Sequence, residues 1–269
     1  MASSPADSTL DERYRSVLER VANAEARAGR PKGAVHTIAV TKYAEMDDVL
    51  RLIELGHRDF GENRVQQLTQ RAAHIDELMN RRATLTKASV ETGGSGAPPE
   101  PVRWHLIGHL QRNKAKPAAE VTRLIHSVDS LRLAEELQAI GLKREHPIEL
   151  LVQVNCSGED QKYGCNVSAT QALCEAIDGM SALRVRGLMT MAAYSDEPED
   201  ARQTFARCRE IYDDITRLEL NEGRFNILSM GMSGDFEVAI EEGANLVRVG
   251  SAIFGERPPA SDDDSDEED

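Results

Sequence analysis

Lys42 follows the apolar run at residues 34–41 and is a candidate nucleophile for carbonyl chemistry. A polar residue that closes a buried parallel strand lies at the strand's carboxyl end, where such sheets carry their functional groups. A lysine partly removed from water at that place presents a neutral amine, which attacks aldehydes to form a Schiff base. The alternative is a lysine whose stem lies along the core while its ammonium reaches solvent.

Two segments near the end of the chain combine glycine with serine and are candidates for an anion site. Residues 229–235 (SMGMSGD) precede a short helical pattern, and Gly250 and Ser251 come at the end of another apolar run. Glycine lets backbone N–H groups approach an anion, and a helix N-terminus favours negative charge. Either turn alone is also typical of an ordinary helix cap. Together with a lysine at a strand end, the two turns predict a phosphorylated aldehyde as the ligand.

The histidine and cysteine patterns indicate neither a metal site nor a disulfide framework. His105 and His109 stand four residues apart, but no glutamate follows in the HExxH pattern, and their segment is typical of a strand and a turn. The cysteines, which lack CxxC spacing, are Cys156, Cys165, Cys174 and Cys208. We therefore expect reduced thiols that are mostly buried.

Apolar runs rich in β-forming residues recur along the chain and are separated by helical patterns. There are eight, at residues 34–41, 58–61, 103–108, 124–128, 148–155, 185–191, 225–229 and 246–250. Between them, apolar residues recur three and four positions apart, as in amphipathic helices. This alternation predicts a parallel sheet with helical crossovers, because parallel neighbours cannot be joined by a tight turn.

The number of runs and the chain length favour a closed barrel. A (β/α)8 barrel of about 250 residues needs eight such units, and its strands are covered on both faces. The alternative is an open doubly wound sheet, but no GxGxxG or GxxxxGKS/T motif follows the first run. The sequence thus predicts an α/β protein built as a single TIM barrel.

Capping-box spacing marks two helix starts, at Thr9 with Glu12 and at Ser168 with Gln171. The first of these opens an extra helix before the first strand. Its apolar residues fall on one face, so we expect this N-terminal helix to pack on the barrel.

Composition along the chain predicts where the ordered domain begins and ends. We expect residues 1–10 to be a flexible N-terminus and residues 11–260 to form the barrel. Residues 84–101 (TLTKASVETGGSGAPPEP) have few large apolar groups and predict a disordered insert. Residues 261–269 predict a disordered acidic tail.

Composition and charge exclude several classes of function. The chain has 269 residues, 40% hydrophobic and 29% charged, which is typical of a globular protein. Its net charge of -14, half of it from the acidic tail, lacks the basic footprint of a nucleic-acid-binding protein. No run approaches the ~20 apolar residues of a membrane span, and the first residues contain no apolar signal segment. We therefore expect a cytoplasmic protein with no nucleic-acid or membrane partner.

Several long motifs carry a resemblance that spans nearly the whole expected barrel. In chain order they are AVTKYAEMDDV, FGENRVQQL, WHLIGHLQRNK, SVDSLRLAEEL, VQVNCSGEDQKYGC, GLMTM and LSMGMSGDFEVAIEEGANLVRVGSAIFGER. The chain resembles the pyridoxal phosphate homeostasis protein family. The resemblance implies a single barrel similar to the N-terminal domain of alanine racemase, a fold-type III protein, and fails only in the insert, the tail and the first few residues.

The resemblance implies a chemical role for several residues. Lys42 would form the internal aldimine with pyridoxal 5'-phosphate, and Arg248 would lie near the pyridine nitrogen. Because a guanidinium is permanently charged and cannot accept a proton, the cofactor would be a weak electron sink. Around the phosphate the resemblance implies Ser229, the Met230 backbone, Ser233, Gly250 and Ser251. Asn63 and His105 stand where either side chain would hold the cofactor's ring or phenolic oxygen.

The resemblance also bears on whether the protein is an enzyme. Racemisation through this cofactor needs a base on each face of the substrate carbon, and similar racemases take the second base from a tyrosine supported by an additional β-domain. We expect no such domain, because the expected barrel takes up nearly all of the ordered sequence, and no motif places Tyr43, Tyr163, Tyr194 or Tyr212 as the base. We therefore expect a protein that buffers pyridoxal phosphate and delivers it to apo enzymes, as a monomer or weak dimer.

Three alternatives stay open. The first is a fold-type III amino-acid racemase or decarboxylase that uses pyridoxal phosphate. The second is a Schiff-base aldolase for phosphosugars, which also combines a barrel with a lysine and a phosphate cup. The third is an interaction protein that acts through the acidic tail, in which Ser261 and Ser265 precede acidic residues as acidophilic kinase sites do.

Overall fold

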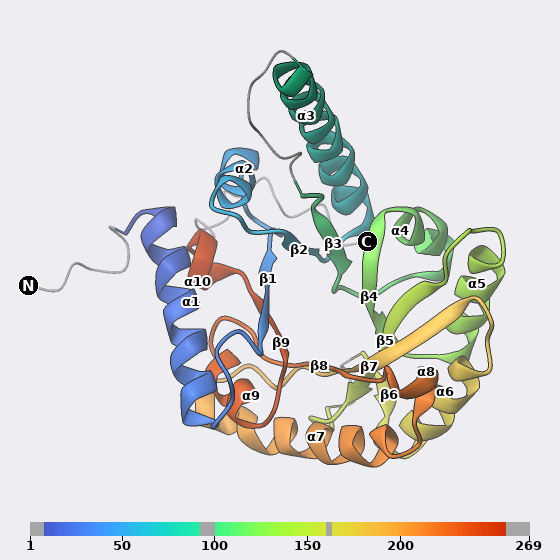
Figure 1. Ribbon diagram of the computed structural model, residues 1–269. Helices are drawn as coiled ribbons and strands as arrows, with labels where there is room; N and C mark the ends of the chain where they lie inside the picture. Colours follow the sequence, from blue (N-terminus) through green and yellow to red (C-terminus); the bar gives the residue numbers. More distant parts are fainter. Residues whose placement is uncertain (1–7, 92–99, 160–162, 257–269) are drawn as a thin grey trace, which may run out of the picture.

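Parallel strands form a closed ring at the centre of the molecule (Figure 1). The computed structural model describes residues 8–91, 100–159 and 163–256. Within these residues the ring consists of β1 (His36–Val40), β2 (Asp59–Glu62), β3 (Arg103–Leu106), β4 (Thr122–Val128), β5 (Ile148–Asn155), β7 (Leu183–Met189), β8 (Ile227–Ser229) and β9 (Leu246–Val249). The strands follow the order β4-β3-β2-β1-β9-β8-β7-β5, and pairing of β4 with β5 completes the circle. The predicted (β/α)8 barrel is confirmed, and the open sheet is wrong.

Helices surround the ring and connect successive strands (Figure 1). The longer ones are α1 (Leu10–Arg27), α2 (Met46–Glu54), α3 (Val65–Glu91), α4 (Ala115–Val121), α5 (Leu131–Gly141), α6 (Thr170–Asp178) and α7 (Arg202–Thr216). The shorter elements are α8 (Leu220–Gly223), α9 (Phe236–Glu241), α10 (Ser251–Phe254) and 3₁₀ turns at Arg112–Lys114, Val167–Ala169 and Pro198–Ala201. Strand β6 (Cys165–Asn166) pairs with β5 but forms no part of the ring.

The main hydrophobic core lies between the strands and the helices. Each helix turns an apolar face toward the barrel: in α2, Val49, Leu52 and Ile53 are buried, whereas Asp47 on the opposite face is exposed. Burying a side chain of this size contributes about 1.5–3 kcal/mol relative to leaving it in water. This layer fixes the strands and therefore the loops at their ends.

The inside of the barrel follows the period of two along each strand, because successive residues point to opposite faces. A Cβ added to Gly61 of β2 would lie 2.8 Å from Cγ2 of Ile38 on β1, so these two positions face each other inside the ring. Lys42 is four residues beyond Ile38 and falls on the same face. The strand geometry therefore aims Lys42 at the mouth of the barrel.

Helix α1 begins as the sequence predicts. The Thr9 hydroxyl accepts from the Glu12 N–H, and the Glu12 carboxylate accepts from the Thr9 N–H, so the capping box is confirmed. Figure 1 shows α1 lying beside α9 and α10, which close the barrel after β8 and β9. Since Thr9 and Leu10 are already part of this helix start, the expected boundary after residue 10 was too late; residues 1–7 lie outside the described residues.

The second predicted capping box is wrong. A 3₁₀ turn at Val167–Ala169 precedes α6, so the α-helix begins at Thr170, two residues after Ser168. The Thr170 hydroxyl donates to the carbonyl of Asn166, and the Gln171 side chain donates to Glu175 farther along the helix. The tighter turn shifts the register, which removes Gln171 from the position that a capping box requires.

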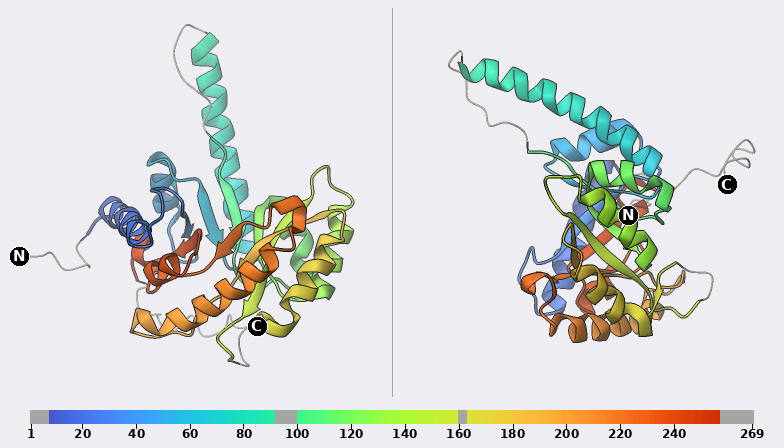
Figure 2. Two further views of the ribbon diagram at one scale, coloured as in Figure 1. Left: turned by 60° about the horizontal axis from the view of Figure 1, so that its bottom comes forward. Right: turned by 90° about the vertical axis from the view of Figure 1, so that its right-hand side faces the viewer.

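Helix α3 projects away from the barrel as a long arm (Figure 2). It continues to Glu91, so the expectation of a disordered insert beginning at residue 84 was wrong for its first eight residues. Alanine, leucine, lysine and glutamate in this stretch have good helix propensity, and a helix that is already nucleated extends at little cost. Residues 92–99 of the expected insert and the acidic tail, with Ser261 and Ser265, lie outside the described residues.

The cysteines are free thiols, as predicted. Cys156, Cys174 and Cys208 are buried and Cys165 is partly buried, and burial raises the pKa of the Cys174 thiol. Among the described helices, none combines the length and apolar character that crossing a membrane requires.

Candidate functional site

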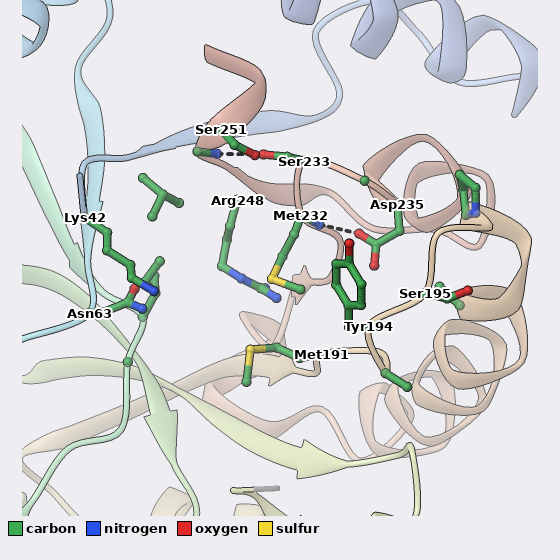
Figure 3. A pocket seen from close by; sticks show the side chains of 18 of the residues that line it. Lys42, Asn63, Met191, Tyr194, Ser195, Met232, Ser233, Asp235, Arg248 and Ser251 are labelled. Atoms are coloured by element: carbon green, nitrogen blue, oxygen red, sulfur yellow. Dashed lines mark hydrogen bonds between the residues drawn. The ribbon is translucent and has the colours of Figure 1, made fainter. Parts of the chain in front are cut away.

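A cavity of about 530 Å³ opens at the carboxyl ends of the strands. Six of the predicted residues line it: Lys42, Asn63, Ser233, Arg248, Gly250 and Ser251. Figure 3 shows Lys42 and Asn63 together on one side and Ser233 with Ser251 on another, and the Arg248 side chain extends between the two groups. The structure thus brings the predicted amine and the predicted anion turns to one cavity.

Lys42 stands at the rim of this cavity, two residues beyond the last residue of β1. Its side chain is exposed, so the expectation that it is partly removed from water was wrong. The Nζ atom lies 4.6 Å from the centre of the Tyr43 ring, where an ammonium is attracted to the electron-rich face. The amine is therefore accessible to a ligand that enters from solvent.

A buried ion pair fixes the segment that carries Lys42. Glu62 is fully buried and accepts a hydrogen bond from the Thr41 hydroxyl (2.6 Å), while its carboxylate lies 2.9 Å from Nε of Arg71 on α3. The Arg71 guanidinium also donates to the carbonyl of Ala44 (2.6 Å). Burial raises the pKa of Glu62, although the Thr41 hydroxyl and the Arg71 charge act against that shift. We call Thr41, Glu62 and Arg71 the wall clamp, because they hold the backbone on both sides of Lys42.

The two glycine-serine turns are joined by one side chain. The Ser233 hydroxyl accepts hydrogen bonds from the N–H groups of Gly250 (3.0 Å) and Ala252 (3.2 Å) at the start of α10. The carboxylate of Asp235 accepts from the Met232 N–H and shapes the turn before α9. Burial raises the pKa of Asp235, which faces the same cavity. Ser233 therefore sets the relative position of two short helix starts.

Arg248 is a buried cation at the floor of the cavity. Its guanidinium donates to the Ser229 hydroxyl (2.5 Å) and to the carbonyl of Thr190 (2.9 Å). Burial lowers its pKa to about 10, while the nearby carboxylate of Asp235 acts in the opposite direction. Arg248 is therefore charged at neutral pH.

Three predicted residues do not line the cavity. His105 is buried inside the barrel and bonds to His126 and Asp59, and Ser229 is fully buried between His126 and Arg248. Met230 is also fully buried, and its backbone N–H already donates a hydrogen bond to the carbonyl of Leu246. His105 and Ser229 lie deeper inside the barrel than the cavity, and Met230 is buried in the main hydrophobic core, so the expectation that these three residues line the ligand surface was wrong.

His105 and His109 have separate partners despite their spacing. The His109 ring stacks on Tyr163 with centroids 4.0 Å apart, and its Nδ1 lies 3.8 Å from Asp129. The His105 nitrogens contact His126 and Asp59 inside the barrel. Among the described residues, no group of three or more histidine, cysteine or acidic side chains is placed to hold a metal ion.

The cavity also contains residues that sequence reasoning did not assign to it. Gln153, Met191, Tyr163 and Tyr194 line the wall, and Tyr194 is almost fully exposed. The period of two predicts both Gln153 and Met191 to face inward, because Gln153 lies on β5 and Met191 stands two residues beyond the inward-facing Met189 at the end of β7. The tyrosines come from loops, where no periodicity predicts a side chain's direction.

The donor set has a defined chemistry. It combines one accessible primary amine, a cluster of serine hydroxyls at two short helix starts, and a buried guanidinium between them. An aldehyde suits the amine, and an anion suits the hydroxyls and helix starts. A ligand with both groups, of a size that fits this cavity, would reach all three.

Comparison with known proteins assigns the family. Residues 15–258 match the model described as alanine racemase, N-terminal domain. The chain is 37% identical to a protein of Pseudomonas aeruginosa named pyridoxal phosphate homeostasis protein, over 93% of this chain and 96% of that one.

Two solved structures are similar throughout. One is an unknown protein from Bifidobacterium adolescentis, with TM-score 0.77, 36% identity and coverage of 94% of this chain and 97% of that one. The other is PipY of Synechococcus elongatus with pyridoxal phosphate bound, with TM-score 0.69, 30% identity and coverage of 89% and 100%. This chain belongs to the pyridoxal phosphate homeostasis protein family, whose barrel is that of the alanine racemase N-terminal domain.

Proposed function

We propose that this protein binds pyridoxal 5'-phosphate through a covalent link to Lys42, buffers it and delivers it to apo enzymes in the cytoplasm. The observation that carries the proposal is the cavity in which the Lys42 amine and the Ser233–Ser251 turns face Arg248 from two sides. The structure of the relative PipY from Synechococcus elongatus contains bound pyridoxal phosphate, which supports the same ligand for this protein. As in the sequence prediction, we propose a monomer or weak dimer.

The residues present fit this ligand. Pyridoxal phosphate supplies an aldehyde that condenses reversibly with amines, a phosphate and a ring nitrogen. Lys42 would hold the aldehyde carbon, Ser233 and Ser251 with Gly250 would hold the phosphate, and Arg248 would face the ring. Asn63 lies beside Lys42 and is proposed to contact the ring oxygen.

The charge of Arg248 favours binding over chemistry on amino acids. A guanidinium donates hydrogen bonds but cannot accept a proton, and its positive charge disfavours protonation of a ring nitrogen beside it. A ring that stays neutral withdraws electrons poorly. The exposure of Lys42 also suits transfer, because an incoming amine from a recipient reaches the same carbon from solvent.

The direct test of the proposal is to fix the adduct chemically. The protein is incubated with pyridoxal phosphate, reduced with borohydride and digested, and the labelled peptide is identified by mass spectrometry. We expect the label on Lys42, its loss in Lys42→Ala and its retention in the control Lys116→Ala, which changes an exposed lysine on α4. Undiminished labelling of Lys42→Ala would contradict the proposed site.

A second candidate function is an amino-acid racemase or decarboxylase that uses the same ligand. The observation in its favour is that Tyr163 and Tyr194 line the cavity that contains Lys42, where a hydroxyl could act on a substrate. Incubation with a panel of L-amino acids, followed by chiral analysis, separates the two functions. Turnover at ordinary enzyme rates that disappears in Tyr163→Phe or Tyr194→Phe would favour the enzyme.

A further inference from the structure

A chain of hydrogen bonds crosses the inside of the barrel and ends at Arg248. Asp59 contacts Nε2 of His105 (3.3 Å), and Nδ1 of His105 contacts Nε2 of His126 (3.1 Å). Nδ1 of His126 contacts the Ser229 hydroxyl (3.1 Å), which accepts from Arg248 (2.5 Å). His126 and Ser229 are fully buried, and His105 is only 5% exposed. The cavity chemistry leaves all of these groups except Arg248 without a role.

The path runs through the interior of the barrel and not along its wall. His126 is on β4 and Ser229 is on β8, and these strands are separated by at least two others in either direction around the ring. Their side chains therefore meet only across the lumen. The chain begins at Asp59, the first residue of β2, near the end of the barrel opposite the Lys42 cavity. Asp59 and Arg103 line a second cavity, of about 400 Å³, at that opposite end.

The chemistry of the end groups fixes the direction of every hydrogen bond. Arg103 lies 2.6 Å from the Asp59 carboxylate and contributes to holding the pKa of Asp59 well below its usual range, so Asp59 only accepts. His105 must then donate through Nε2 and, as a neutral ring, accept at Nδ1. By the same logic His126 donates from Nε2 and accepts at Nδ1.

At the other end of the chain Arg248 has only donors, so the Ser229 hydroxyl accepts from it and donates its own proton to His126. Every donor therefore points from the guanidinium toward the carboxylate. A protonated histidine would reverse or break one of these bonds. Burial lowers the pKa of both rings and keeps them neutral, which preserves the single direction.

We propose that Asp59, His105, His126 and Ser229 are positioning residues that hold the Arg248 guanidinium in one orientation beneath the bound ligand. Arg248 needs such support because a buried cation is costly unless its donors are satisfied by fixed acceptors. The oriented chain places one acceptor, the Ser229 hydroxyl, at Arg248 and ends on a carboxylate across the barrel. The significance for the ligand rests on the proposed function, whereas the orientation of the chain does not.

The first test measures the chain in the wild-type protein without any ligand. Two-dimensional ¹⁵N NMR of the imidazole rings distinguishes a protonated Nε2 from a protonated Nδ1. We expect His105 and His126 to be neutral Nε2–H tautomers at pH 7. An Nδ1–H tautomer or a charged ring at either position would overturn the proposal, whatever the protein binds.

The second test asks whether the far end of the chain affects the ligand. Asp59→Asn keeps the size of the side chain but removes the terminal charge. The matched control is Glu149→Gln on β5, which also removes a carboxylate paired with arginines, Arg123 and Arg186, but is not in the chain. Each variant is titrated with pyridoxal phosphate and with pyridoxine 5'-phosphate, which has the ring and phosphate but no aldehyde.

We expect Asp59→Asn to weaken both ligands by between about twofold and thirtyfold relative to the wild type, the usual range for coupling through a packed network. Glu149→Gln should bind both ligands as the wild type does. Equal affinities in Asp59→Asn and Glu149→Gln would overturn the proposal. Absence of any pyridoxal phosphate adduct in the wild type would instead contradict the proposed function, and the NMR test of the chain would still stand.

Discussion

Two buried polar clusters flank the candidate site, and they handle charge in different ways. In the wall clamp, the carboxylate of Glu62 and the guanidinium of Arg71 touch, at 2.9 Å. In the interior chain, the charges of Arg248 and Asp59 are joined through one serine and two neutral histidines. The direct contact between Glu62 and Arg71 joins two elements of the barrel wall, whereas the neutral groups between Asp59 and Arg248 set the orientation of the guanidinium from across the barrel.

The two clusters should therefore contribute differently, one to the stability of the fold and the other to the position of Arg248. The wall clamp ties α3 to the segment around Lys42, so its loss should lower the stability of the barrel wall. The interior chain is supported by the strands that surround it, and its loss should affect Arg248 more than the fold. The largest change is therefore expected in the wall clamp and the smaller ones in the interior chain.

Arg71→Met should cause the largest loss of stability among single substitutions in the two clusters. It leaves the Glu62 carboxylate fully buried without a cation, and breaking a buried pair in this way typically costs about 3–5 kcal/mol. Urea denaturation followed by circular dichroism measures the free energy of unfolding. The double variant Glu62→Gln with Arg71→Met should recover part of the loss, because the neutral amide needs no counter-charge.

The matched control is Arg81→Met on the same helix. Arg81 pairs with Glu77 at 2.6 Å, but both side chains are mostly exposed, and surface pairs contribute little. If Arg71→Met and Arg81→Met were equally stable, the wall clamp would not be a stabilising element, and the contrast with the interior chain would fail.

Ser229→Ala tests the interior chain with a smaller change. It removes one of the two acceptors of Arg248 and leaves Nδ1 of His126 buried without a donor, for which we expect a loss of about 1–3 kcal/mol. The neighbouring Ser127→Ala is the control: the Ser127 hydroxyl is buried and makes no hydrogen bond among the described residues, so its removal should not destabilise the fold. A greater loss of stability in Ser127→Ala than in Ser229→Ala would reverse the assignment.

These clusters also mark how far the sequence predicts the structure. Apolar runs and their number predict the barrel, and the polar residue after each run predicts the rim, as Lys42 and Asn63 demonstrate. The depth at which a side chain lies inside the barrel is not predicted in the same way. Each residue advances about 3.3 Å along a strand, so an uncertainty of one or two residues in a strand's end moves Ser229 between the cavity surface and the interior.

His126 was missed for a related reason. It lies in the middle of the apolar run LIHSV, where a single histidine has no pattern of its own, and its partner Ser229 is 103 residues away. The usable signal was the period of two, which puts His126 on the same face as Leu124 inside the barrel. Contacts across the lumen join residues that no local spacing relates, so the interior chain required the three-dimensional structure.

The two clusters should respond to pH with opposite sign, and this is the smallest of the expected effects. Burial lowers the pKa of His126, so the folded protein keeps this ring neutral while the unfolded chain takes up a proton below about pH 6.5. The stability that His126 contributes is therefore complete above that pH and is lost as the pH falls. Burial raises the pKa of Glu62, so the pH-dependent part of its contribution is complete below about pH 4.3 and is lost as the pH rises through the folded pKa.

Between pH 7 and pH 5.5 the interior chain should therefore contribute to the slope of stability against pH, together with the buried His57, whose pKa burial also lowers. We expect the free energy of unfolding to fall on acidification, with His126 contributing up to about 1.4 kcal/mol per pH unit below its unfolded pKa. His126→Gln should flatten this slope, whereas His74→Gln, which changes an exposed residue on α3, should leave it unchanged. Because only the slope is compared, a general loss of stability in His126→Gln does not affect the test. Equal slopes in the wild type and His126→Gln would mean that acid does not act on the protein through the interior chain.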